Sequence, residues 1–133
     1  MKPRQNQRQS SKSSLHTQLL GKKGEDLAAS YLIKHKYQIK ERNFKARYGE
    51  IDIIAVKDGV LVFVEIKTRA GRAFGLPEEA VTPRKLREVV GTAHYYKLLH
   101  PELPDAMQID VIGIELDFTE TIKYFNHIEN VTQ

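Results

Sequence analysis

The sequence predicts a single domain of mixed α and β structure (α/β or α+β), with the element order α-β-β-β-α-β(-β). Two segments carry apolar residues at three- and four-residue spacing, which is typical of amphipathic helices. Between and after them lie short runs rich in Val and Ile, which are typical of strands. A length of 133 residues suits one domain. Together these observations predict a mixed sheet packed against helices.

The N-terminal end divides into a tail and the first helix. Residues 1–14 are polar and basic, and they hold too little apolar surface to offset the entropy of ordering. We therefore expect a disordered basic tail over 1–14 and one domain over 15–133. The first helix is predicted from Leu15 to about Lys36. Its small and apolar residues recur at helical spacing: Leu20, Gly24, Leu27, Ala28, Tyr31.

The elements that follow are bounded by turn signals. Three strands are predicted over residues 38–44, 49–56 and 60–68. Asp58-Gly59 joins the last two as a two-residue hairpin turn, because Gly tolerates the positive φ that such turns require. After a loop over 70–81, Thr82-Pro83 resembles an N-cap followed by Pro at the first helical position. The second helix is expected to run to about Leu99, with strands over 107–116 and 122–128.

Composition excludes several classes of protein. The chain has no Cys, so disulfides, thiolate catalysis and Cys-ligated metal centres are excluded. No run of about 18 apolar residues is present, so we expect no membrane span. The basic N-terminus has no apolar segment behind it, which argues against a signal peptide and favours the cytoplasm. No phosphate-binding glycine motif follows a strand, so no nucleotide cofactor is expected.

Charge is distributed unevenly along the chain. The first hundred residues sum to a net +10, whereas residues 101–133 carry only Lys123 against seven acidic residues. Such polarity favours an anionic partner such as nucleic acid, although a solvated surface explains it equally simply.

The predicted hairpin gathers charged residues on one face. The turn at Asp58-Gly59 places Asp52 opposite Glu65 and Glu50 opposite Lys67, and opposed side chains share a face. The other face is expected to be core, because its residues are all apolar: Ile51, Ile53, Ala55, Val62, Val64, Ile66. A register slip of one residue would bury the acids.

Three carboxylates against one ammonium leave negative charge that needs a counter-ion. Like charges about 4 Å apart cost roughly 4 kcal/mol at an effective dielectric near 20. A divalent cation removes that cost, and oxygen ligands favour Mg²⁺ or Mn²⁺. The alternative is an ion-pair ladder worth about 0–1 kcal/mol. The Glu65-x-Lys67 pair sits inside an apolar run, residues 60–66, where charges are expensive, and this favours a site. Glu25, on the first helix, could reach over the sheet to this patch or pair with Lys22 or Lys23.

Several blocks of the sequence carry a resemblance to a known family. They are Gly21-x-x-Gly24-Glu25-x-x-Ala28-x-x-Tyr31-Leu32, Asn43, Gly49-Glu50-Ile51-Asp52-Ile53-Ile54-Ala55, Phe63-Val64-Glu65-Ile66-Lys67-Thr68-Arg69, Phe74-Gly75, Pro77, Lys85 and Asp110-Val111. The chain resembles the YraN-like family of endonuclease-like bacterial proteins. It is similar, more distantly, to archaeal Holliday junction resolvases and to the PD-(D/E)xK nuclease superfamily.

The resemblance implies the restriction-endonuclease-like fold, with a metal at Asp52 and Glu65 and with Lys67 beside it. Glu25 matches the helical acid that many resolvase-like members place near the metal. Gln108 departs from the family pattern, because many members carry Arg there. Resolvase-like members cut a junction twice, which implies a symmetric homodimer.

The function expected from these residues is a Mg²⁺- or Mn²⁺-dependent endonuclease acting on DNA, on branched or damaged structures. Asp52, Glu65 and the carbonyl of Ile66 would hold the cation, and Lys67 would orient water or stabilise developing charge. Glu50 and Glu25 are further catalytic candidates, for a second cation or for orienting water. The alternatives are a non-catalytic nucleic-acid-binding module with the same fold, and an interaction protein whose carboxylates form an ion-pair ladder.

Two further groups of residues could contact nucleic acid. The loop and helix start over residues 69–85 hold basic residues that could clamp a phosphate backbone, or form a mobile solvated loop. These basic residues are Arg69, Arg72, Arg84 and Lys85. Tyr95-Tyr96 could stack on bases, although aromatic core packing is favoured.

Overall fold

A computed structural model describes the backbone of residues 2–132 and the side chains of residues 15–132. The elements are α1 (Lys2–Lys34), β1 (Gln38–Ala46), β2 (Gly49–Lys57), β3 (Val60–Ala70), the 3-10 helix η1 (Pro77–Ala80), α2 (Pro83–Leu99), β4 (Met107–Leu116) and β5 (Ile122–Ile128). This order confirms the predicted α-β-β-β-α-β-β sequence, including the last strand.

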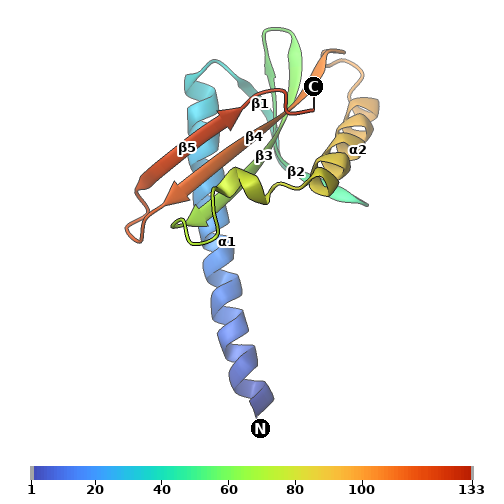
Figure 1. Ribbon diagram of the computed structural model, residues 1–133. Helices are drawn as coiled ribbons and strands as arrows, with labels where there is room; N and C mark the ends of the chain where they lie inside the picture. The colour runs from blue at the N-terminus through green and yellow to red at the C-terminus, as the bar shows by residue number, and fades with distance from the viewer. Residues whose placement is uncertain (1, 133) are drawn as a thin grey trace.

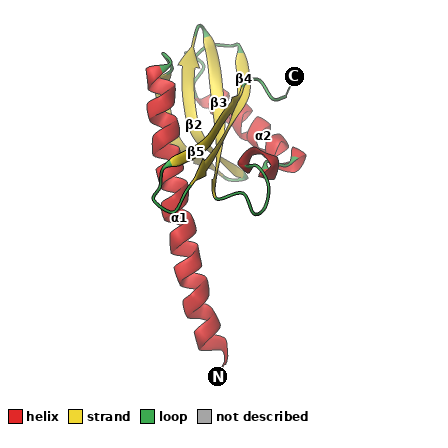
Figure 2. Ribbon diagram, turned by 60° about the vertical axis from the view of Figure 1, so that its left-hand side comes forward, coloured by secondary structure: helices red, strands yellow, loops and turns green. Residues whose placement is uncertain are grey.

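The five strands form one mixed sheet in the order β1-β2-β3-β4-β5. The pair β3–β4 is parallel and the other neighbours are antiparallel. The parallel pair needs a crossover connection, and the chain supplies it through η1 and α2. The helices α1 and α2 lie on opposite faces of the sheet (Figures 1 and 2).

Each helix buries its apolar side against its own face of the sheet. The α1 face contains Ala28, Leu32, Ile53, Ala55, Val62, Val64, Ile112, Ile114 and Leu116. The α2 face contains Ile51, Ile54, Leu61, Phe63, Val89, Ala93, Tyr96 and Ile109. Residues of both clusters alternate along β3, which is the central strand and is therefore buried on both sides.

The two turn signals in the sequence act as predicted. Asp58 and Gly59 have φ angles of 50° and 76°, and the β2–β3 ladder starts with Lys57 opposite Val60. At the start of α2, the Lys85 amide donates a hydrogen bond to the Thr82 side chain at 3.1 Å, and Pro83 follows this cap. The cap fixes the direction in which the first turn of α2 points, which matters for the site described below.

The beginning of α1 projects beyond the sheet (Figure 1). The helix α1 begins at Lys2, whereas the sequence predicted its start at Leu15. Residue 1 and the side chains of residues 2–14 lie outside the described part of the structure, and the division into a tail over 1–14 and a domain over 15–133 stays a prediction. The helix ends at Lys34, before Lys36 adopts a φ of 73°. Among the described residues, no helix combines the length and the hydropathy that crossing a membrane requires.

Candidate metal centre

The strands β2 and β3 separate beyond the pair Ile53–Val64, where their ladder ends. Beyond this pair, a side chain replaces the backbone as acceptor: the Ile66 amide donates a hydrogen bond of 2.7 Å to Asp52 Oδ2. The predicted cross-strand pair of Glu50 with Lys67 is therefore wrong. Glu50 instead lies opposite Lys45 on β1.

The separation also corrects the predicted apolar face of β2. Ile53 and Ala55 pack toward α1 as part of one face, whereas Ile51 packs in the cluster beneath α2. Alternation along β2 thus breaks at Asp52, the residue whose side chain enters the gap. Here β2 stays paired with β1 but no longer pairs with β3, so it can twist locally. The sequence pattern does not show where this separation begins.

The carboxyl groups of Asp52 and Glu65 influence each other's pKa. Burial raises the pKa of Asp52, although the Ile66 amide opposes this shift. Burial together with the neighbouring Asp52 carboxylate raises the pKa of Glu65 to about 8. The two acids therefore influence each other's protonation, although the predicted opposed pair of Asp52 with Glu65 lies just beyond the last pair of the ladder, Ile53–Val64.

One oxygen of this pair has no hydrogen-bond donor. Glu65 is 12% exposed, and its Oε2 accepts no hydrogen bond from any residue in the described part of the chain. The nearest ammonium is that of Lys85, whose Nζ lies 4.0 Å from Oε2. An unpaired buried carboxylate oxygen is costly, and a divalent cation would satisfy it. The residues therefore fit Mg²⁺ or Mn²⁺, whereas the Ile66 carbonyl as a third ligand stays a prediction.

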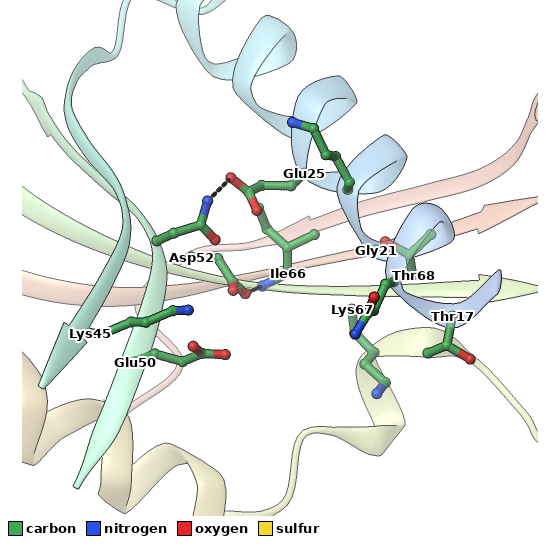
Figure 3. A pocket seen from close by; sticks show the side chains of 12 residues that line it. Thr17, Gly21, Glu25, Lys45, Glu50, Asp52, Ile66, Lys67 and Thr68 are labelled. Atoms are coloured by element: carbon green, nitrogen blue, oxygen red, sulfur yellow. Dashed lines mark hydrogen bonds between the residues drawn. The ribbon is translucent and has the colours of Figure 1, made fainter. Parts of the chain in front are cut away.

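Asp52 lines a pocket of about 550 Å³ between α1 and the first three strands, whereas Glu65 lies outside its lining (Figure 3). Its wall holds acidic and basic side chains together: Lys22, Glu25, Lys45, Glu50, Asp52 and Lys67. The three ammonium groups would attract an anionic ligand, and a cation held by the carboxylates would bind the same ligand.

Glu25 extends from α1 over the pocket, which is one of the two alternatives that the sequence left open (Figure 3). Its Oε1 accepts hydrogen bonds from Arg42 Nε at 2.8 Å and from Asn43 Nδ2 at 3.0 Å. The alternative pairing with helix lysines does not occur among the described residues, since Lys22 pairs with Asp26 at 3.6 Å. Glu25 is thus held in place from β1, with its second carboxylate oxygen left for a pocket ligand.

The two lysines have different positions relative to Glu65. Lys67 is exposed and lines the pocket, whereas Lys85 is the cation nearest Glu65. The sequence placed Lys85 among the residues that contact nucleic acid, and it missed the proximity to Glu65. The sequence placed Lys85 in the first turn after the Thr82 cap, but only the structure shows that this turn lies near Glu65.

The other basic residues predicted to contact nucleic acid differ in whether they already have a partner. Arg72 donates to Glu115 on β4 at 2.6 Å and lies 5.1 Å above the Tyr124 ring, so it is engaged away from the pocket. Arg69 has a buried Nε without a partner among the described residues. Arg84 is 85% exposed and lies 3.7 Å from Glu88. Phosphate contacts by these residues stay predictions.

A second cluster, missed from the sequence, joins β4, β5 and the end of α1. Asp110 is fully buried, and its Oδ2 lies 2.8 Å from His127 Nε2. The other ring nitrogen of His127 lies 3.0 Å from the Tyr31 hydroxyl. Asp110, His127 and Glu129 present ligand atoms within 4.8 Å of one another.

Hydrogen bonds already occupy this second cluster. Asp110 Oδ1 accepts from Gln108 Nε2 at 2.9 Å and from the Asn130 amide at 3.0 Å. Gln108, the departure from the family pattern, therefore supports Asp110. We interpret the cluster as an anchor that ties α1 to the sheet, because every oxygen of Asp110 has a partner.

The profile of the family described as "Uncharacterised protein family UPF0102" matches residues 24–114. The chain belongs to the UPF0102 family. The matched span contains Glu25, Asp52 and Glu65, so the candidate metal centre lies within the family's common region. This confirms the YraN-like resemblance at the level of the family.

Individual UPF0102 proteins align over most of their length. A relative from Syntrophomonas wolfei is 46% identical over 111 residues, covering 84% of this chain and 95% of the relative. One from Geobacter metallireducens is 43% identical over 117 residues, covering 88% and 94%. One from Persephonella marina is 42% identical over 94 residues, covering 71% and 81%.

The raised pKa values predict how the stability of the metal-free protein depends on pH. Because the pKa of Glu65 is higher in the folded than in the unfolded protein, its contribution to stability is lost as pH rises toward 8. In Asp52→Asn, the amide keeps an acceptor for Ile66 and gains a donor for Glu65. We expect the variant to melt about 3–8 °C higher than wild type in EDTA at pH 8, with a smaller gain at pH 5.

Circular dichroism melts between pH 5 and 8 measure this difference. Glu120→Gln, an exposed acid at the β4–β5 turn, is the control and should keep the wild-type pH dependence. A melting temperature for Asp52→Asn that equals or falls below that of wild type at every pH would contradict the interaction between the two carboxyl groups.

Proposed function

We propose that the chain is a Mg²⁺- or Mn²⁺-dependent endonuclease that hydrolyses phosphodiester bonds in DNA. The observation that carries the proposal is the buried pair of Asp52 and Glu65, in which Glu65 Oε2 has no hydrogen-bond partner among the described residues and Asp52 lines a pocket that also holds lysines. The similarity of the sequence blocks to PD-(D/E)xK nucleases and Holliday junction resolvases supports the same reaction.

The residues at the proposed site would have different roles in the reaction. Asp52 and Glu65 would hold the cation. When bound, the cation would polarise the scissile phosphate and lower the pKa of a water molecule. Lys67 would bind the phosphate from the exposed side, and Glu25, fixed by Arg42, would accept a hydrogen bond from the attacking water.

A cleavage panel tests this function. Labelled single-stranded, duplex, flap and four-way-junction DNA would be incubated with the full chain and Mn²⁺, with Mg²⁺, or with EDTA. We expect cleavage of at least one substrate with Mn²⁺ and none in EDTA. Glu65→Gln should lower the rate at least about 100-fold, because it removes a ligand charge.

Lys67→Ala separates phosphate binding from metal binding in this panel. We expect it to slow cleavage about 10- to 100-fold while leaving Mn²⁺ affinity within about twofold, since Lys67 is exposed and lies outside the acid pair. Glu120→Gln is again the matched control. Tight DNA binding without cleavage of any substrate would instead support the non-catalytic binding module.

A further inference from the structure

A second cavity, of about 500 Å³, lies beside the turn that joins β1 to β2 and against one side of α2. We call it the Tyr48–Tyr95 groove. Its lining residues come from these two segments: Ala46, Arg47, Tyr48, Arg87, Glu88, Gly91, Thr92 and Tyr95.

The groove presents two aromatic rings that the core does not use. Tyr48 is 78% exposed and Tyr95 is 48% exposed. The neighbouring Tyr96, in contrast, is buried and packs edge-on against Phe44 and Phe63. The structure thus separates the Tyr95-Tyr96 pair into one core residue and one exposed ring. Exposed rings on a concave surface offer π-faces to a planar ligand.

The charges around the groove favour an anionic ligand. Arg47 lies 5.1 Å above the Tyr48 ring, and neither Arg47 nor Arg87 forms an ion pair with any described side chain. The one acidic lining residue, Glu88, already lies 3.7 Å from Arg84. Aromatic rings interleaved with unpaired guanidinium groups are the combination that binds single-stranded nucleic acid.

The groove lies on the α2 side of the β1–β2 hairpin, and the candidate metal pocket lies on its α1 side, so the two cavities meet at this hairpin. At the β1–β2 turn, Lys45 and Glu50 line the metal pocket, while Ala46, Arg47 and Tyr48 between them line the groove. On α2, Lys85 approaches Glu65, and Gly91 of the groove lies six residues further on, roughly 9 Å along the helix axis. One strand could therefore pass from the metal pocket over the turn into the groove.

We propose that the Tyr48–Tyr95 groove binds an unpaired nucleotide of the DNA strand that is cut in the adjoining metal pocket. The base stacks on the tyrosine rings, and Arg47 and Arg87 neutralise the flanking phosphates. The inference rests on the proposed function for its position relative to the cut. It narrows the substrate class to DNA with unpaired nucleotides beside the scissile bond, such as a flap or a branch.

Fluorescence anisotropy with the full chain in EDTA, which prevents cleavage, tests the groove separately from catalysis. The probes are a labelled 20-nucleotide single strand of DNA, the blunt duplex of the same sequence, and the single-stranded RNA equivalent. We expect Tyr48→Leu and Tyr95→Leu each to weaken binding of single-stranded DNA about five- to one-hundred-fold. Binding of the duplex should change less than about twofold.

Two further variants serve as controls for this experiment. Tyr48→Trp keeps a stacking surface and should retain wild-type affinity. Phe118→Leu removes a ring that is 99% exposed at the β4–β5 turn. Because β5 is at the opposite edge of the sheet from β1, this variant should keep the wild-type affinity for single-stranded DNA.

Several outcomes would overturn the inference. They are unchanged binding of single-stranded DNA by both Leu variants, an equal loss on duplex, or a loss confined to RNA. A change from dimer to monomer in Tyr48→Leu, measured by sedimentation without a change in DNA binding, would show that a second copy of the chain occupies the groove. Tyrosine-dependent binding of single strands supports the groove even if the cleavage panel fails. Cleavage of DNA without tyrosine-dependent binding of single strands would reject the proposal for the groove and leave the proposed function standing.

Discussion

Replacing Asp52 by alanine is expected to remove Mn²⁺ binding from the pocket between α1 and β3, and to lower the proposed DNA cleavage at least about 1,000-fold. The Asp52 carboxylate is the only one of the pair that a backbone amide orients, through the 2.7 Å hydrogen bond from Ile66. Without it, Glu65 remains as a single buried carboxyl with a raised pKa, and a protonated carboxyl does not ligate a hard cation.

Isothermal titration calorimetry with Mn²⁺ measures this effect. Wild type should bind more tightly as pH rises, because the pair retains a proton that the cation must displace, and titrations in two buffers should reveal the released proton. Glu120→Gln is the matched control, since Glu120 is an exposed acid at the β4–β5 turn and lies outside the pocket. Wild-type Mn²⁺ affinity in Asp52→Ala would eliminate the metal centre and the proposed reaction together.

The sequence could predict the closeness of the two acids because a local rule determined the hairpin. The turn at Asp58-Gly59 requires positive φ, and that requirement fixes the register from Lys57 to Ile53. Extending the same register to Glu50 and Lys67 failed. The point at which β2 leaves β3 depends on how β1 and α1 pack around it, and that packing involves residues distant in sequence.

Non-local contacts explain the other residues that the sequence could not place. Lys85 reaches Glu65 only because α2, which connects β3 to β4 in the chain, packs over β2 and β3. Arg42 reaches Glu25 only because β1 lies beneath α1. Periodicity identifies which side of a helix is buried, but it does not identify the neighbour that a charged side chain will meet. The anchor of Asp110 and His127 was missed for the same reason, since its members come from two strands.

Gly24→Ala is expected to destabilise the protein by about 3 kcal/mol, or about 10 °C in melting temperature. A Cβ atom at this position would lie 1.8 Å from Thr68 Oγ1 and 2.9 Å from Thr68 Cβ, so α1 and β3 could not keep their present separation. Thr68 belongs to the central strand, which has little freedom to move. The helix must shift instead, and the packing of Ala28 and Leu32 is lost with it.

Gly21→Ala, one turn earlier in α1, is the matched control. Nothing lies within 4 Å of its added Cβ, so alanine should raise stability by about 0.5–1 kcal/mol through its higher helix propensity. Thermal melts of the two variants in EDTA measure the contrast, and Thr68→Ala should restore part of the loss in Gly24→Ala. Equal stability of the two variants would contradict the close approach of α1 to β3. Because Gly24 directly precedes Glu25, a displaced helix would also carry that carboxylate away from Asp52, so the proposed cleavage should fall even at temperatures where the variant is fully folded.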